Sequence, residues 1–424
     1  MIVEIINTGS ELMLGRVLNT HAQWLCRQLA DLGYVVSRQV AVADTAGQIQ
    51  QAVREALSRA DLVLSTGGLG PTSDDLTRNL IAELLGKDLH EDAAVLAQIK
   101  SFFDLRHRPM PELTRVQALV PEGALVLANT HGTAPGLAIQ VIPNAFSERG
   151  TPAWLMMLPG PPRELRPMFL DIVVPLLQRE LPLNSSFVCR TLRTAGLGES
   201  IVQEKIHDSL ASLVVEGLDV GYCARPWQVD VRLSARGSMA ETLVNKGESI
   251  VRKCLKENVF ASGDQDLAHV IIDALSSRKE TLVLAESCTG GFVANQLTNV
   301  PGASAVIPAG WVTYSNEAKE KLLGVQHSTL EQHGAVSEQA AIQMAEGARK
   351  QFRSDYALAV TGIAGPGGGT SQKPVGTVFI ALAGPFETDF QKRLNPYDRE
   401  TFKSVTAQQA LDLLRRRLGL LRSD

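Results

Sequence analysis

The sequence predicts an α/β protein of three domains, with a helix-covered parallel sheet in the N-terminal domain, a small α+β middle domain and an α/β C-terminal domain. Three observations lead to this prediction. Residues 1–180 alternate short apolar runs with amphipathic stretches, the pattern of βαβ units. After residue 187, short alternating strands are interleaved with helical stretches. From residue 263, an apolar strand again leads into glycines and a helical pattern.

The first predicted domain, residues 1–180, contains a glycine-rich loop at 65–75 between a strand and a helix. Sheets of this kind bind ligands beyond the carboxyl ends of their strands, so this loop is a candidate binding site. The expected strands are 2–8, 35–42, 62–65, 137–142 and 154–158, and the expected helices are 19–32, 49–60 and 76–85.

The second and third predicted domains are residues 181–262 and 263–424. In the second, 229–233 alternates as a strand does and 199–210 has helical periodicity. The third opens with a helical stretch at 267–276 and an apolar strand at 281–285. A second apolar strand, from 357, runs into a loop with glycines at 362, 365 and 367–369.

Charge and cysteine content restrict the location and the partners. A net charge of −4 provides no general field for nucleic acid or an anionic membrane, and the basic cluster at 415–417 is typical of a solvated helix end. The five cysteines are scattered without a C-x-x-C pair, which argues against a disulfide framework or structural zinc. We therefore expect a cytoplasmic protein with no signal segment or membrane span.

Ser287 is the most interesting single residue, because it directly follows an apolar strand and precedes Gly290, Gly291 and a helical pattern. Such a turn can expose a nucleophile, while backbone N–H groups of the new helix face the same space and suit a developing oxyanion. Two alternatives stay open. The turn can be a helix cap without catalysis, and Cys288 offers the intrinsically stronger nucleophile.

A base for Ser287 must come from elsewhere, because no histidine lies within residues 281–311. Lys319 is the natural candidate, although alone it would be a surface lysine. To act as a base, a lysine must lose its proton, which requires burial or a like charge to lower its pKa by about 3 units. The glycine-rich loop from residue 362 can bring backbone N–H groups close to a phosphate, or it can simply be a turn.

Three ordered motifs, at 285–291, 313–319 and 360–366 with 373–377, resemble the nicotinamide mononucleotide deamidase (PncC-type) domain of the CinA family. The resemblance implies hydrolysis of nicotinamide mononucleotide to nicotinate mononucleotide and ammonia, without a cofactor. It makes Ser287 the nucleophile and Lys319 the base. The residues it assigns to substrate positioning, oxyanion support or substrate binding are Tyr314, Thr361, Gly290, Gly291, Gly362, Gly365 and, for the phosphate, Arg399. Near Arg399 the chain has Tyr397 where the family pattern has glycine.

The N-terminal motifs at 8–15, 67–75, 132–136 and 158–164 resemble the molybdopterin-binding-like domain of CinA proteins. The resemblance implies metal-dependent cleavage of ADP-ribose to AMP and ribose 5-phosphate, with Mg²⁺, Mn²⁺ or Co²⁺. The implied metal ligands are Asp74, Asp75, Glu11 and Glu164. Two alternatives stay open, in which the Asp pair only caps a helix or the domain binds a molybdopterin-type ligand without catalysis. His21 stands where the family pattern has a small polar residue.

The middle domain resembles the KH-type insert of the same family. No G-x-x-G loop with basic flanks lies between residues 190 and 262, so nucleic-acid binding is not supported. The resemblance also implies a homodimer. For the whole protein, two functions of different class remain. One is a pyridine-nucleotide salvage enzyme acting on small nucleotides, and the other is a partner-binding protein of competence or DNA damage.

Overall fold

The computed structural model describes residues 1–148, 150–183 and 185–420. The chain divides into two compact units, Met1–Val188 and Cys189–Asp424. Residues 421–424, at the end of the third predicted domain, lie outside the described residues. The predicted fold class is confirmed: a mixed, largely parallel sheet, a small α+β sheet and a second α/β sheet follow one another along the chain. Among the described residues, no helix has the length and apolar character needed to cross a bilayer.

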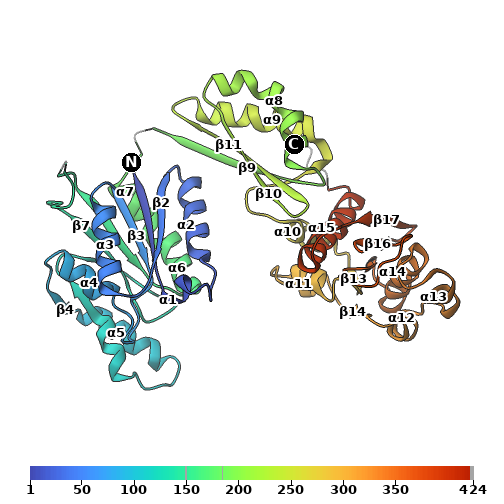
Figure 1. Ribbon diagram of the computed structural model, residues 1–424, viewed down its shortest axis with the longest axis horizontal. Coiled ribbons are helices and arrows are strands. Elements are labelled where there is room, and N and C mark those ends of the chain that lie inside the picture. The colour runs from blue at the N-terminus through green and yellow to red at the C-terminus, as the bar shows by residue number, and fades with distance from the viewer. Residues whose placement is uncertain (149, 184, 421–424) are drawn as a thin grey trace. The chain divides into compact units, whose positions relative to one another are not determined.

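The first unit is built on a six-stranded sheet of order β2-β1-β3-β8-β7-β6 (Figure 1). Strands β2, β1, β3 and β8 run parallel, whereas β7 and β6 are antiparallel. The carboxyl ends of β1 and β3 therefore meet at one edge of the sheet. The strands are β1 (Val3–Thr8), β2 (Val36–Val42), β3 (Leu62–Thr66), β6 (Leu125–Leu127), β7 (Gly136–Val141) and β8 (Ala153–Leu158), with β4 (Leu89–Glu91) and β5 (Leu119–Pro121) as a separate pair.

Helices cover both faces of this sheet because its strands are apolar on both sides. One core joins the sheet to α3, α4 and α5, and the other joins it to α2, α6 and α7. The helices are α1 (Ser10–Met13), α2 (Thr20–Asp31), α3 (Ala46–Leu57), α4 (Thr77–Leu84), α5 (Ala93–Asp104), η1 (Glu112–Ala118), α6 (Pro162–Met168), η2 (Phe169–Val173) and α7 (Val174–Glu180).

The second unit begins with a four-stranded sheet of order β10-β11-β9-β12, on which α8 and α9 lie side by side (Figure 1). Apolar residues of both helices and of β11 are buried. These elements form the middle domain. They are β9 (Phe187–Ala195), α8 (Glu199–Val215), β10 (Asp219–Arg225), β11 (Gln228–Arg236), α9 (Ala240–Leu255), η3 (Lys256–Asn258) and β12 (Val259–Ser262).

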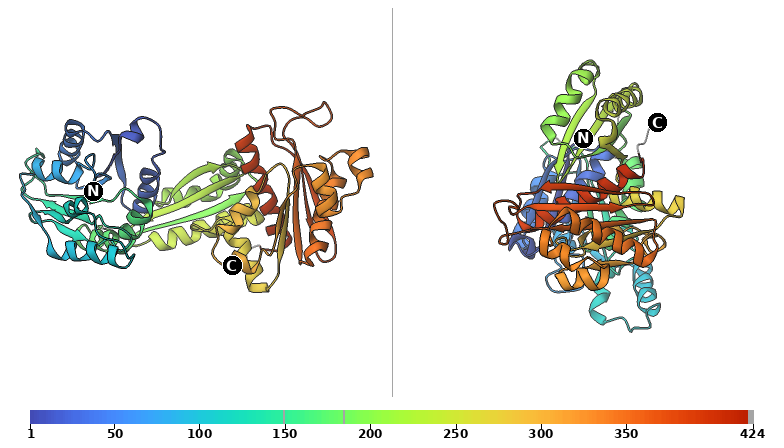
Figure 2. Two further views of the ribbon diagram at one scale, coloured as in Figure 1. Left: turned by 90° about the horizontal axis from the view of Figure 1, so that it is seen from below. Right: turned by 90° about the vertical axis from the view of Figure 1, so that its right-hand side faces the viewer.

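The C-terminal part of the second unit has a five-stranded sheet of order β14-β13-β15-β16-β17, with β14, β13 and β15 parallel. Helices α10, α11 and α15 pack on one face and α12, α13 and α14 on the other, as Figure 2 shows for α15 and the orange helices. The elements are α10 (Leu267–Arg278), β13 (Leu282–Glu286), α11 (Phe292–Thr298), η4 (Ala303–Ala305), β14 (Gly310–Val312), α12 (Asn316–Leu323), α13 (His327–His333), α14 (Glu338–Phe352), β15 (Tyr356–Gly362), β16 (Thr377–Ala383), β17 (Thr388–Leu394) and α15 (Arg399–Arg417).

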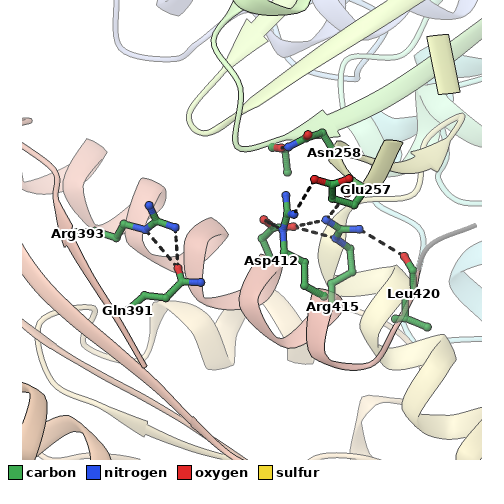
Figure 3. Close-up of polar contacts among 9 residues, drawn as sticks. Glu257, Asn258, Gln391, Arg393, Asp412, Arg415 and Leu420 are labelled. Atoms are coloured by element: carbon green, nitrogen blue, oxygen red, sulfur yellow. Dashed lines mark hydrogen bonds and ion pairs between the residues drawn. The ribbon is translucent and has the colours of Figure 1, made fainter. Parts of the chain in front are cut away.

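Helix α15 also joins the C-terminal sheet to the middle domain. The guanidinium of Arg415, which is 0% exposed, is paired with Asp412 and donates to the backbone carbonyl of Glu257 (Figure 3). Its Nη1 also donates to the carbonyl of Leu420. A buried charge of this kind holds only where every partner is in place, so the two parts are fixed to each other here.

Candidate active site

Ser287 lies in the turn between β13 and α11, at the carboxyl end of a central strand. Its backbone N–H donates to the carbonyl of Val360 at 2.9 Å, which ties the turn to β15. The turn needs glycine, because Gly290 and Gly291 have φ values of 61° and 89°, which side chains disfavour. The side chain of Ser287 is 8% exposed. The predicted strand–turn–helix geometry is therefore present, with the hydroxyl largely removed from water.

Lys319 comes to Ser287 from α12, thirty-two residues later in the chain. The helix begins after Ser315, whose hydroxyl accepts the backbone N–H of Ala318, and Lys319 lies one turn in, on its buried side. Its Nζ is 3.2 Å from Ser287 Oγ and donates to the carbonyl of Thr313 at 2.8 Å. The two residues meet because β13 and β14 are parallel neighbours, so the segments that follow them start at the same edge.

The environment of Lys319 makes its proton easier to lose. The residue is 1% exposed, and burial lowers the pKa of its ammonium. Among the described residues it forms no ion pair with a carboxylate, and a smaller charge interaction with Cys288 opposes the lowering of its pKa. A neutral amine 3.2 Å from a hydroxyl can accept the hydroxyl proton, so the pair has the chemistry of a nucleophile and its base.

Cys288 lies beside Ser287 but belongs to the hydrophobic core of the C-terminal sheet. Burial, with a smaller contribution from the nearby carboxylate of Glu286, raises the pKa of its thiol to about 12. The thiol is therefore protonated at neutral pH, and the thiolate is the reactive form of cysteine. The geometry favours Ser287 over this competitor.

Glu286, the last residue of β13, is a functional residue that the sequence prediction missed. Its buried carboxylate accepts the backbone N–H groups of Gly291, Val293 and Ala294 at 2.8–3.1 Å. These are N–H groups at the start of α11, so the expectation that this helix would offer them to an oxyanion is wrong. A carboxylate ending an apolar strand just before two glycines was the available signal, because such a buried charge needs donors.

The predicted residues Tyr314, Gly365 and Arg399 meet at the exposed rim of the site. The guanidinium of Arg399, in the first turn of α15, donates to the Tyr314 hydroxyl at 2.6 Å and to the carbonyl of Gly365 at 3.0 Å. The helix starts here because the Asp398 carboxylate accepts its first free N–H groups. Arg399 thus connects three segments that are far apart in the sequence.

Thr361 and Gly362 end β15 next to the nucleophile turn. The Thr361 hydroxyl is buried and donates to the carbonyl of Ala335 at 2.8 Å, so its proton is not directed at a substrate. A Cβ on Gly362 would lie 2.8 Å from the carbonyl oxygen of Thr377 and 3.1 Å from the sulfur of Cys288. Both residues therefore fit a role in packing the loop against the turn.

In the first unit, the predicted glycine loop follows β3 and packs against the end of β1. A Cβ on Gly67 would lie 2.7 Å from the carbonyl oxygen of Thr8, and one on Gly68 would lie 2.1 Å from the Thr77 hydroxyl oxygen. Arg78, in the first turn of α4, is 3% exposed and has no ion-pair partner within the described parts of the chain. The loop and this buried cation lie where a parallel sheet binds anions.

The four predicted metal ligands do not form a ligand set. Asp75 accepts the backbone N–H and the hydroxyl of Thr72, Glu164 accepts Asn129 Nδ2, and Asp74 and Glu11 are exposed. Nowhere in residues 1–148, 150–183 or 185–420 do three His, Cys, Asp or Glu side chains gather closely enough to hold a metal. The capping interpretation also fails, since α4 has no side-chain cap.

The two departures from the family pattern have different surroundings. The ring of His21 donates from Nε2 to the carbonyl of Gly160, and burial lowers the pKa of this imidazole. Tyr397 is half exposed and lines a cleft of about 340 Å³ with Trp227 of the middle domain. Neither residue is part of the Ser287–Lys319 pair.

Comparison with known proteins covers the chain in three parts. The model described as "CinA C-terminal domain" matches residues 264–418, "Probable molybdopterin binding domain" matches 4–179, and "Damage-inducible protein CinA KH domain" matches 189–261. A "CinA-like protein" from Akkermansia muciniphila is 44% identical over 410 residues, covering 96% of this chain and 95% of that protein. A "Putative competence-damage inducible protein" from Caldicellulosiruptor bescii is 42% identical over 422 residues, covering 99% of each.

Solved structures match part of the chain. The crystal structure of the competence/damage inducible protein CihA from Agrobacterium tumefaciens is 43% identical, with a TM-score of 0.35, and covers 36% of this chain and 93% of that one.

Proposed function

Because this chain belongs to the CinA family, we propose that its C-terminal domain hydrolyses the carboxamide of nicotinamide mononucleotide. The products are nicotinate mononucleotide and ammonia. The observation that carries this proposal is the Lys319 Nζ to Ser287 Oγ distance of 3.2 Å in a site where burial lowers the lysine pKa. A serine with a desolvated lysine as its base is one of the recurrent arrangements for nucleophilic acyl transfer.

The reaction takes two acyl-transfer steps. Ser287 Oγ attacks the amide carbon while Lys319 takes its proton, and the ammonium of Lys319 then gives that proton to the amide nitrogen, which departs as ammonia. This leaves a nicotinoyl ester on Ser287. A water molecule, deprotonated by Lys319, attacks the ester carbon, and Ser287 leaves with the returned proton. One amide C–N bond is broken, one water is consumed, and no redox step occurs.

Oxyanion stabilisation falls to the turn itself, because Glu286 uses N–H groups at the start of α11. Among the described residues, the backbone N–H groups of Cys288 and Thr289 have no backbone acceptor and are directed at the sulfur of Cys288. A substrate oxygen would replace that sulfur as their acceptor. We assign them to the oxyanion of the tetrahedral intermediate, since donors beside the nucleophile are the usual source of this stabilisation. Arg399, held by Tyr314 and Gly365, faces the substrate's phosphate.

The deciding experiment is ammonia release from nicotinamide mononucleotide by the full chain and three variants. Ser287→Ala should lose about 10³-fold or more in kcat/KM, because only binding and oxyanion contacts remain. Cys288→Ala should stay active, and Ser277→Ala, which removes an exposed hydroxyl of α10, is the matched serine control. Free nicotinamide should be a poor substrate. Equal release by wild type and Ser287→Ala, or loss of activity only in Cys288→Ala, would contradict the proposal.

For the N-terminal domain, the proposed second activity is cleavage of ADP-ribose to AMP and ribose 5-phosphate. The supporting observation is the buried Arg78, which donates to the side chain of Asn79 but forms no ion pair among the described residues. It lies just after the Gly67–Gly68 turn and Thr77, a setting that suits a pyrophosphate. The described carboxylates do not fit a metal held by three protein ligands. A Mg²⁺, Mn²⁺ or Co²⁺ ion would have to be held mainly by the substrate phosphates with one or two carboxylates.

Incubation with ADP-ribose and each of these metals tests that activity. AMP should appear with at least one metal and should fall strongly in Arg78→Gln, whereas Arg108→Gln, which changes an exposed arginine of the same unit, should have no effect. If no metal supports AMP formation, the domain is a binding module instead. In that case the alternative is a partner-binding function, which is motivated by the relatives named as competence-damage inducible proteins.

A further inference from the structure

Lys403 lies at the candidate active site although no sequence motif pointed to it. It is on α15, one turn after Arg399, and it is half-buried. A Cβ placed on Gly290 would lie 3.8 Å from its Nζ, and the Nζ is 5.8 Å from the ring centroid of Phe292. Gly290 and Phe292 flank the end of the Ser287 turn, so a cation from α15 is held over the nucleophile turn.

Arg399 and Lys403 are four residues apart, which places them on the same face of α15. Within the described parts of the chain, neither forms an ion pair with a carboxylate. Two nearby carboxylates are already hydrogen-bonded: Asp398 accepts N–H groups of Glu400 and Thr401, and Glu286 accepts three N–H groups of the α11 start. The exposed carboxylate of Glu400, beside Arg399, forms no ion pair with either cation within the described residues. Two like charges on one helix face therefore lack a counter-ion, and an anion between them would relieve their repulsion.

We propose that Lys403 and Arg399 together bind the phosphate of the substrate, and that Lys403 makes the enzyme select a mononucleotide over the corresponding nucleoside. This inference rests on the proposed deamidase function. Arg399 reaches one side of the site, at Tyr314 and Gly365, and Lys403 reaches the other, at the Ser287 turn. A phosphate spanning the two would be held by charge-assisted hydrogen bonds, and the nicotinamide would be anchored at a fixed distance from Ser287.

Kinetics with two substrates tests the selectivity. Wild type, Lys403→Gln, Lys403→Arg and the control Lys205→Gln, which removes an exposed charge from α8, are compared on nicotinamide mononucleotide and nicotinamide riboside. Lys403→Gln should raise KM for the mononucleotide about 10- to 100-fold, the range for one lost charge-assisted contact. KM for the riboside should not change, and Lys403→Arg should recover most of the loss. Equal loss on both substrates would assign Lys403 a structural role instead.

Calorimetric binding separates this inference from the deamidase proposal. In the Ser287→Ala background, nicotinamide mononucleotide should bind more tightly than the riboside, and Lys403→Gln should remove most of that difference. If ammonia release fails but phosphate-dependent binding persists, only the deamidase proposal falls. If release persists and Lys403→Gln leaves the mononucleotide preference intact in both assays, this inference is wrong.

Discussion

At the residue scale, the proposed mechanism depends most on the protonation state of Lys319, because an ammonium cannot accept a proton. The protein meets this demand by burial, which lowers the pKa of Lys319, and by leaving the amine without a carboxylate partner among the described residues. The unfolded chain then binds more protons at this position than the folded chain, between the folded pKa and the ordinary one. Burying Lys319 therefore destabilises the fold most at pH values below the folded pKa, where the amine is charged in both states. The free energy of unfolding rises with pH across that window.

The same shift predicts the acid limb of catalysis. The value of kcat/KM should rise with pH through a pKa below the ordinary lysine value, as Lys319 loses its proton. Lys319→Met should lower kcat/KM about 10²- to 10⁴-fold, the usual share of a general base, while the protein stays folded. Lys321→Met, on the exposed side of the same helix, should leave both the rate and the profile unchanged.

A pH series of ammonia release, with thermal unfolding of the same samples, checks this prediction. An active Lys319→Met protein with the wild-type acid limb would assign the base to another group.

The sequence offered Lys319 as a candidate base for Ser287, and the resemblance to the deamidase domain implied the role of each residue. The 3.2 Å approach of the two side chains is what the structure adds. Glu286 and Lys403 could not be placed in the same way. Their roles depend on where α11 and α15 pack, and no local pattern encodes that packing. Thr361 illustrates the opposite case, since its motif suggested substrate contact and its hydroxyl instead bonds to the carbonyl of Ala335.

At the scale of elements, the segment from β13 through the turn to α11 positions the nucleophile. Helix α11 has seven residues, and its N-cap residue, Gly291, has no side chain that could accept the first N–H groups of the helix. Glu286 supplies the acceptor from the strand below, with two carboxylate oxygens for three N–H groups. Negative charge at a helix N-terminus is stabilising, so this carboxylate fixes the turn that holds Ser287.

Glu286→Gln tests this function of the strand end. The amide keeps the shape but turns one oxygen into an NH₂ group that faces N–H donors, so we expect a loss of about 1–3 kcal/mol in the free energy of unfolding. Ammonia release should fall as well, because the turn shifts. Urea denaturation of Glu286→Gln and of Glu199→Gln, an exposed acidic residue in the first turn of α8, gives the comparison. Equal stability of the two variants would contradict the prediction.

The elements themselves follow well from periodicity where runs are long. The expected strand at 62–65 is β3 (Leu62–Thr66), and the expected helix at 76–85 is α4 (Thr77–Leu84). The three-residue strands β4 and β5 were not predicted, because three residues cannot establish a period of two. The pairing of β14 with β13 was likewise beyond the sequence, although that pairing brings Lys319 to Ser287.

At the scale of the molecule, α15 serves both the site and the junction with the middle domain. Its first turns carry Arg399 and Lys403, and its last turns carry the buried Arg415 pair with Asp412 (Figure 3). Between them, Gln408 accepts from Gln228 of the middle domain and donates to Gln296 of α11. The helix therefore connects the middle domain to the nucleophile turn, and the two parts should unfold together.

Asp412→Ala tests that coupling. It leaves the guanidinium of Arg415 fully buried with only the carbonyls of Glu257 and Leu420 as acceptors, and an uncompensated buried charge costs about 3–5 kcal/mol. The control Glu317→Ala breaks an exposed pair with Lys321 and should cost at most about 1 kcal/mol. In urea denaturation of the full chain, residues 189–420 should unfold in one transition. The midpoint of that transition should lie at a lower urea concentration in Asp412→Ala than in wild type. A loss no larger than that of the control would mean that the Arg415 carbonyl contacts alone sustain the junction.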